Sequence, residues 1–207
     1  MSDENPLIEK LRACAERARH AELTLGEVLD SVQEAAYSFT CIVLSLPFLQ
    51  PLSLGPLGTV GGLTFAALGW QLFHGHPTPL LPARVRQAVI GKKTWEVMIG
   101  VCLKILRWCS QFTKPRLSAW VSGRKGQKVC GLTIIAGGLL MAIPFFGLPL
   151  NNLLPALAIF FVCVAELEQD GIMVFIAFGW LAVTVIYFTV ILIMVWMLGI
   201  QAIDWLR

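Results

Sequence analysis

The chain has 207 residues, of which 57% are hydrophobic and only 14% are charged. Soluble domains carry about 25% charged residues, and the mean hydropathy here is +0.73, so the composition excludes an ordinary soluble domain and indicates a membrane protein. The formal net charge is +3. Because the first forty residues are polar with mixed charges, a cleaved signal peptide is not expected.

The amino-terminal part is expected to be a polar arm, residues 1–23, followed by a helix. In the sequence LTLGEVLDSV, Thr24 precedes Glu27 by three residues, which is the spacing of a capping box and predicts a helix start. The following segment is largely apolar only over residues 39–46, less than half of the ~20 residues that a membrane crossing requires. Pro47 then predicts the end of this helix, because proline lacks the N–H for an intrahelical bond.

A second short apolar helix is expected at residues 59–73, with Thr59 as its N-cap. The intervening sequence PFLQPLSLGPLG is rich in Pro and Gly, so residues 24–73 predict either a re-entrant hairpin or a discontinuous pair of membrane helices. Backbone that opens at membrane depth is tolerated only where protein buries it or where it lines a wet cavity. This first loop offers two polar side chains for substrate binding, Gln50 and Ser53.

The middle of the chain is strongly basic. Residues 84–128 contain eleven Lys or Arg side chains and one acid, Glu96. The positive-inside rule predicts that this region is cytoplasmic, with residues 84–112 as an amphipathic segment in the membrane interface and residues 113–128 as a basic linker. Because apolar segments flank it, the expected partners are the anionic headgroups of membrane lipids and not nucleic acid.

The broken-helix pattern then recurs. Residues 129–143 form an apolar run before Pro144, the loop FFGLPLNN follows, and residues 154–165 return as an apolar helix. At an offset of 97 residues, Pro47 and Phe48 align with Pro144 and Phe145. The chain is therefore expected to contain two repeats, residues 24–112 and 129–207, and the sequence leaves open whether their orientation is parallel or inverted.

Residues 172–200 carry no charge and, at about 1.5 Å per residue, extend roughly 43 Å. That length exceeds the ~30 Å hydrocarbon core, so they predict a C-terminal transmembrane helix. The expected fold is thus an all-α integral membrane protein. It has two repeats of Pro-broken helical hairpins, at residues 24–73 and 129–171, a basic amphipathic middle and the transmembrane helix. With so few full crossings, we expect a homodimer.

The second loop holds two candidate substrate-binding residues, Asn151 and Asn152. An amide at membrane depth can bind a polar headgroup, and the N–H groups of a helix that starts near Leu154 would favour an anion such as phosphate. The alternative is that both asparagines satisfy loop carbonyls.

Two acids, Glu166 and Asp170, are candidates for a proton or ion path, because carboxyl groups in membrane segments often mark one. Their spacing of four predicts a shared helix face; the alternative is that both are solvated at the end of the apolar run. His74 and His76 lack a third ligand and the six cysteines, interpreted as packing residues, contain no C-x-x-C pair, so neither a metal site nor a cofactor is expected. No motif for nucleophilic, nucleotide or zinc-protease chemistry occurs, so an enzyme is not expected.

Four stretches of the chain resemble the bacterial exopolysaccharide synthesis protein ExoD family. They are LTLGEVLDSV, SLPFLQPLSLGPLGTVGGLTFAALGWQL, LLPARV and IPFFGLPLNNLLPALAIFFVCVAELEQDGI, and the resemblance covers residues 23–190. Its most specific part is the Asn-Leu-Leu-Pro-Ala run of residues 152–156, while Gln169 stands where the family tends to have arginine. The resemblance implies a multi-pass protein of the bacterial inner membrane that is tied to exopolysaccharide production and to tolerance of alkaline conditions.

Together these features predict a transporter of an anionic amphiphile, such as a polyprenyl-phosphate carrier or an anionic lipid, whose two loops form one site. Two alternatives remain open. One is a non-transporting accessory subunit of a polysaccharide synthase, bound to other exopolysaccharide machinery. The other is a proton or cation exchanger that uses Glu166 and Asp170.

Overall fold

The computed structural model describes residues 16, 24, 26–27, 35–51, 54–80, 87, 100, 104, 117, 120–145 and 147–205. The elements in these ranges are all helices: α3 (Ala36–Ser45), the 3-10 helix η2 (Leu46–Leu49), α4 (Pro56–Phe73), α7 (Gly123–Ala142), α8 (Leu153–Glu168) and α9 (Gly171–Trp205). The prediction of an all-α protein is therefore confirmed for this part of the chain. The predicted arm, residues 1–23, and the predicted amphipathic segment, residues 84–112, lie almost entirely outside it.

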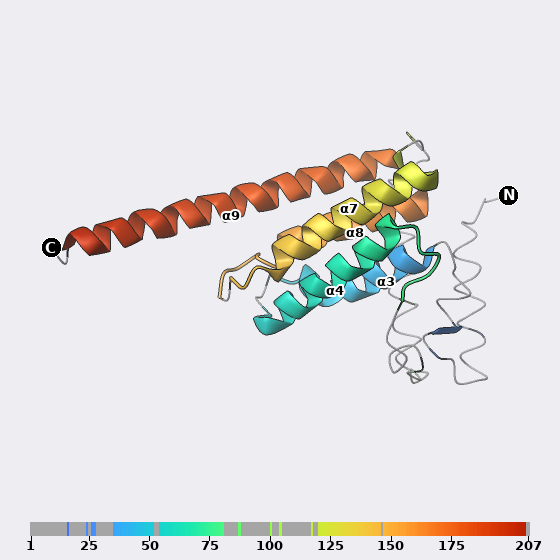
Figure 1. Cartoon of the computed structure of the whole chain (residues 1–207), viewed down its shortest axis with the longest axis horizontal. Helices are drawn as coiled ribbons and strands as arrows, with labels where there is room; N and C mark the ends of the chain where they lie inside the picture. Colours follow the sequence, from blue (N-terminus) through green and yellow to red (C-terminus); the bar gives the residue numbers. More distant parts are fainter. Residues whose placement is uncertain are drawn as a thin grey trace.

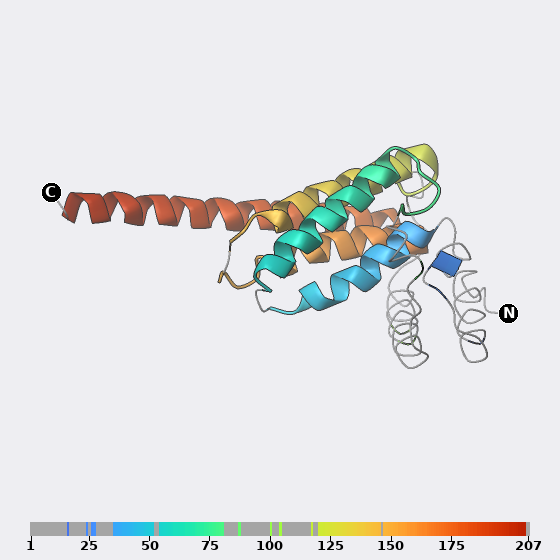
Figure 2. The same ribbon diagram turned by 60° about the horizontal axis from the view of Figure 1, so that its bottom comes forward.

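Helices α3, α4, α7 and α8 lie side by side in a bundle, and α9 runs along the bundle and continues well beyond it (Figure 1). The main pairings are α4 with α7, α8 with α9, α7 with α8, and α3 with α8. Figure 2 shows that α4 and α8 start at the same end of the bundle, on the side where α9 protrudes. We call this the turn end, and we call the opposite end, where α4 finishes and α7 begins, the open end.

The first hairpin agrees in part with the sequence. Thr24 and Glu27 form the predicted capping box: the Glu27 N–H donates to Thr24 Oγ1 at 3.3 Å, and the Thr24 N–H donates to Glu27 Oε2 at 2.9 Å. Helix α3 ends at Ser45, and η2, with Pro47 in its first turn, continues the chain as a tighter helix until Gln50 becomes extended.

Helix α4 starts earlier than expected, at Pro56. Proline suits the first position of a helix, because the N–H that it lacks would have no intrahelical partner there. Gly55 before it has a φ of 57°, which favours glycine. The prediction that Thr59 caps this helix is therefore wrong, since Thr59 lies inside it.

Helix α7 takes in part of the predicted basic linker, residues 113–128, because it begins at Gly123. Arg124, Lys125 and Lys128 are exposed in its first two turns. The helix ends at Ala142, and Ile143 is extended, which is the conformation that a following proline favours.

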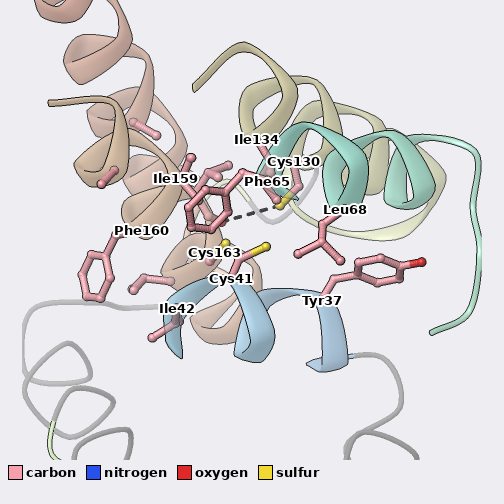
Figure 3. Packing of buried hydrophobic residues seen from close by; sticks show 14 of the residues in the cluster. Tyr37, Cys41, Ile42, Phe65, Leu68, Cys130, Ile134, Ile159, Phe160 and Cys163 are labelled. Atoms are coloured by element: carbon pink, nitrogen blue, oxygen red, sulfur yellow. Dashed lines mark hydrogen bonds between the residues drawn. The ribbon is translucent and has the colours of Figure 1, made fainter. Parts of the chain in front are cut away.

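Apolar side chains from all four bundle helices fill the core. Phe65 of α4, Ile134 of α7 and Ile159 of α8 are fully buried, and Figure 3 shows them close to the buried thiols of Cys41 and Cys163. The cysteines that the structure describes are free and buried, so within these residues they behave as the small packing residues that the sequence predicts.

Glycines allow the backbones of α4 and α7 to touch. A Cβ on Gly62 of α4 would lie 2.6 Å from the carbonyl oxygen of Gly138 of α7, and a Cβ on Gly69 would lie 2.7 Å from the carbonyl oxygen of Gly131. Small residues are typical of helix interfaces in membranes, where they permit this close packing.

Helix α9 contains the one stretch among the described residues that is long and apolar enough to cross a membrane, Gly171–Leu198, with a mean hydropathy of 2.6. It coincides with the predicted transmembrane helix at residues 172–200. The large apolar side chains of its protruding half are exposed, among them Ile186, Val195 and Leu198, and such a surface favours contact with lipid chains.

Replacing Gly62 by Ala is expected to destabilise the fold by about 1–3 kcal/mol, the usual cost of overpacking, because the new methyl group would force α4 and α7 apart. Thermal unfolding in detergent should show a Tm lowered by about 2–4 °C for each kcal/mol. Gly179→Ala in α9 is the matched control: nothing lies within 4 Å of a Cβ there, so its Tm should be unchanged or higher. A Gly62→Ala protein with the wild-type Tm would contradict the close contact.

Candidate functional site

The starts of α4 and α8 meet at the turn end. A Cβ on Gly58, in the first turn of α4, would lie 2.5 Å from Asn152 Oδ1. Asn152 is the residue immediately before α8. Its side chain therefore lies directly against the α4 backbone. The two turns are thus in contact, and this contact requires glycine at position 58.

The two asparagines of the second loop differ in their bonding. Asn151 Nδ2 donates to the carbonyl oxygen of Phe145 at 2.9 Å, so Asn151 satisfies a loop carbonyl. Asn152 is 1% exposed, and neither its Nδ2 nor its Oδ1 has a hydrogen-bond partner among the described residues. Leaving a buried polar group unpaired costs about 1–3 kcal/mol. Asn151 has one such atom, Oδ1, whereas in Asn152 both polar atoms are unpaired and no bond explains the side chain.

Few free N–H groups remain at these helix starts. In α4, Pro56 has no N–H and the next two N–H groups donate to loop carbonyls; in α8, the Leu154 N–H donates to the Leu150 carbonyl at 3.1 Å and Pro155 has none. The expected row of backbone donors is therefore largely occupied. What the site offers an anion is the dipoles of two helix N-termini and the Nδ2 group of Asn152.

The second loop is attached to α9. The Tyr187 hydroxyl donates to the carbonyl oxygen of Pro149, and the ring of Phe145 packs on that of Phe188 with 5.2 Å between centroids. These contacts fix the height of the loop along α9. Of the first-loop candidates, Gln50 is exposed, and Ser53 lies outside the described residues.

A second polar cluster lies nearer the open end, where α3, α7 and α8 meet. Glu166 of α8 is partly buried, and its Oε2 accepts hydrogen bonds from Ser38 Oγ of α3 and, at 3.4 Å, from Cys130 Sγ of α7. Glu166 lies outside the stretch Gly171–Leu198. Burial raises the pKa of its carboxyl above the usual 4.5, although these two hydrogen bonds oppose the shift. Sequence reasoning missed Ser38 and Cys130, because no local pattern connects them with Glu166.

Asp170 has a structural role at the turn between α8 and α9. The Ile172 N–H donates to Asp170 Oδ1 at 3.0 Å, which is the bond of an N-cap residue. Helix α8 ends at Glu168, and Gln169 is left-handed with a φ of 53°. The prediction that Glu166 and Asp170 share one helix face is therefore wrong, because the helix ends between them.

The histidine pair lies at the open end. The ring of His74 packs on that of Trp70 at 4.3 Å between centroids, and its Nδ1 lies 2.8 Å from the Trp70 carbonyl oxygen. In the described part of the chain, no group of three or more His, Cys, Asp or Glu side chains is arranged to hold a metal ion.

Glu166 should give the fold a pH dependence. Its pKa in the folded protein is raised above the unfolded value of 4.5, so the folded protein holds a proton that the unfolded chain releases, and stability falls as the pH rises through this window. Glu166→Gln removes the effect. The Tm difference, variant minus wild type, is therefore expected to grow as the pH rises above 4.5 in thermal unfolding experiments. Glu16→Gln, at an exposed position, is the control, and a difference that does not change with pH would contradict this titration.

Known proteins are similar to this chain over most of its length. The family described as "Exopolysaccharide synthesis, ExoD" matches residues 7–190. The chain is 28% identical over 169 residues to Protein ExoD of Rhizobium meliloti (strain 1021), covering 82% of this chain and 70% of that protein. It is 27% identical over 175 residues to Uncharacterized protein slr1875 of Synechocystis sp., covering 82% and 81%. No solved structure matches. Since the family match spans most of the chain, the protein belongs to the exopolysaccharide synthesis ExoD family.

Proposed function

We propose that the protein is a multi-pass transporter of the bacterial inner membrane that moves an anionic amphiphile, such as a polyprenyl-phosphate carrier or an anionic lipid, during exopolysaccharide synthesis. The observation that carries the proposal is Asn152. Its buried amide has no hydrogen-bond partner among the described residues, and it lies where two helix N-termini meet. Because an unpaired buried amide destabilises a fold, its presence here favours a role in binding a headgroup.

The length of α9 supports re-entrant hairpins. Along the helix, Tyr187 is about 24 Å from Gly171 and about 17 Å from Leu198, at 1.5 Å per residue, so it lies near the middle of the stretch Gly171–Leu198. The second loop is hydrogen-bonded to Tyr187, and Asn152 of that loop touches α4. With α9 across the membrane, both turns would therefore lie inside the bilayer, close to its midplane.

The bonding of the second loop suits such a depth. In the bilayer core, backbone carbonyls need partners within the protein. The Phe145 carbonyl has Asn151 Nδ2, and the Pro149 carbonyl has the Tyr187 hydroxyl. Both partners are side chains placed next to an irregular segment of backbone, which favours a loop that water does not solvate.

The helix pairings support two repeats in parallel orientation. Helix α3 packs on α8, and α4 packs on α7; a two-fold axis that exchanges the hairpin α3–α4 with the hairpin α7–α8 would also exchange these two pairs. Both hairpins turn at the same end of the bundle (Figure 2), as an axis along the bundle requires. We therefore propose parallel repeats with Pro47 and Pro144 at equivalent breaks.

The exposed face of α4 suits the apolar part of an amphiphile. Leu57, Val60 and Leu63 are each more than half exposed, and they lie on the same turns as Gly58, which touches Asn152. A headgroup at Asn152 would leave its hydrocarbon chain in the lipid beside this face, where no apolar surface has to be exposed to water.

Charge at the open end supports a cytoplasmic location for that end. Arg124, Lys125 and Lys128 are exposed there, and Lys128 Nζ lies 5.9 Å from the centroid of the Phe73 ring. Trp70, at the same end, is 60% exposed. Basic residues with interfacial aromatics are typical of the cytoplasmic membrane surface, where they attract anionic lipid headgroups.

The uncovered half of α9 leaves room for a second helix within the lipid, and we propose that a second copy of the chain packs there, so that the protein acts as a homodimer. A component of a polysaccharide synthase at the same surface would make the protein an accessory subunit. Co-purification of such a component, together with no translocation by the isolated protein, would favour the accessory role.

Translocation of a fluorescent short-chain polyprenyl phosphate in proteoliposomes tests the site. Asn152→Leu keeps the side-chain shape and removes two unpaired polar atoms, so its Tm should equal or exceed that of the wild type, while translocation should fall to the level of protein-free vesicles. Asn151→Leu is the matched control: it loses the bond to Phe145, so its Tm should fall, but the folded protein should still translocate. Wild-type translocation by Asn152→Leu would exclude Asn152 as the binding residue.

The depth of the hairpins can be measured with nitroxide labels on α4. Leu57→Cys and Trp70→Cys place labels at two exposed positions that are about 20 Å apart along the helix. In reconstituted vesicles, the label at position 57 should collide more with oxygen, and less with a water-soluble nickel complex, than the label at position 70. Unmutated protein, labelled in the same way, gives the background. Two equally shallow labels would show that the hairpin lies on the membrane surface.

A further inference from the structure

Glu166 is the polar side chain that joins three helices of the bundle. Its Oε2 accepts hydrogen bonds from Ser38 of α3 and Cys130 of α7, and both donors are almost fully buried. Glu166 stands in the last turn of α8, towards the open end, and the residue as a whole is only partly buried although its carboxyl contacts buried donors.

None of the described groups that contact the Glu166 carboxyl is positively charged. Ser38 comes from α3 and Cys130 from α7, and the thiols of Cys41 and Cys163 lie in the same core cluster. No Lys or Arg of the described segments is paired with it. Glu166 also stands two residues before the end of α8 at Glu168, where the helix dipole disfavours a negative charge. Burial without a counter-charge and the position at the end of the helix favour the protonated carboxyl, whereas the hydrogen bonds from Ser38 and Cys130 favour the carboxylate.

A proton suits this cluster better than a metal cation does. Hard cations such as Ca²⁺ take six to eight oxygen ligands, whereas the groups facing Glu166 are one hydroxyl and thiols. Within the described residues no cluster is arranged to hold a metal ion. A single carboxyl with two neutral donors is sufficient to bind and release one proton.

We infer that Glu166 is a proton-binding site whose charge state opens and closes the junction of α3, α7 and α8, and thereby controls the headgroup site at Asn152. The carboxylate takes one proton from cytoplasmic water to form the neutral acid and returns it to the same water. In the neutral form the junction is closed. When the proton leaves, the unpaired charge draws water between the helices and weakens their contact. The control of Asn152 rests on the proposed function, because it presumes that a headgroup binds there.

Helix α8 is the element that connects the two sites. It begins next to Asn152 and carries Glu166 in its last turn, about 21 Å further along. A headgroup can reach Asn152 only if the two hairpins separate at Gly58, since the side chain is buried against that backbone. Loosening of the helices that pack on α8 favours this separation, so translocation should be faster when Glu166 is ionised.

The experiment measures two properties of full-length protein in vesicles at a series of pH values. The first is translocation of the fluorescent polyprenyl phosphate, and the second is the infrared C=O absorption of protonated carboxyl groups. Wild-type translocation should rise by about tenfold per pH unit on the acid side of its transition, as expected for one ionising group. Glu166→Gln should stay at the slow acid rate at every pH, Glu166→Asp should keep a pH dependence, and Glu16→Gln should match the wild type. The wild type should show a titrating carboxyl band that Glu166→Gln lacks.

The outcomes separate this inference from the proposed function. If the wild type translocates and Glu166→Gln keeps the same pH dependence, the control by Glu166 is wrong while the transporter remains. If no variant translocates above protein-free vesicles at any pH, the proposed function fails, and the infrared band alone decides the proton site. A band that is the same in Glu166→Gln and in the wild type would overturn that site, and a band missing only in Glu166→Gln would support it.

Discussion

The close contact of α4 and α7 is the interaction on which the turn end depends. Because Gly62 and Gly138 leave no side chain between the two backbones, a helix of the first hairpin is held against a helix of the second. The start of α4 is thereby placed beside the end of α7, and Gly58 can touch Asn152. A larger side chain in this interface would separate the two turns. The polar cluster at Asn152 would then have one helix N-terminus near it instead of two.

Two neighbouring asparagines at the start of α8 have different surroundings. Asn151 is bonded within its own loop, where its Nδ2 group donates to the Phe145 carbonyl. The hydroxyl of Tyr187 in α9 donates to the Pro149 carbonyl of the same loop. Asn152 lies against the other hairpin, next to the α4 backbone at Gly58. The loop is therefore held in place without the side chain of Asn152, whose amide stays unpaired.

Features that depend on a few adjacent residues were predictable from the sequence, and features that depend on distant contacts were not. The capping box at Thr24 involves two side chains one turn apart, so its spacing is a sufficient signal. Thr59 was chosen as a cap because its residue type fits, but Pro56 fits the first helical position better and starts the helix earlier. Helical periodicity does not detect the left-handed Gln169 that ends α8. Ser38 reaches its carboxyl partner across 128 residues, a separation at which no spacing rule applies.

The dipole of helix α8 favours a negative charge at the start of the helix and disfavours one at its end. The two polar clusters, at Asn152 and at Glu166, lie near these two ends. At its start, the positive end of the helix dipole and the amide of Asn152 favour an anion. At its end, the negative end of the dipole and burial disfavour the ionised form of Glu166, although the hydrogen bonds from Ser38 and Cys130 oppose this effect. An anion at the start and a proton at the end therefore stabilise the same helix. A single element of sixteen residues thus connects the proposed headgroup site with the proposed proton site.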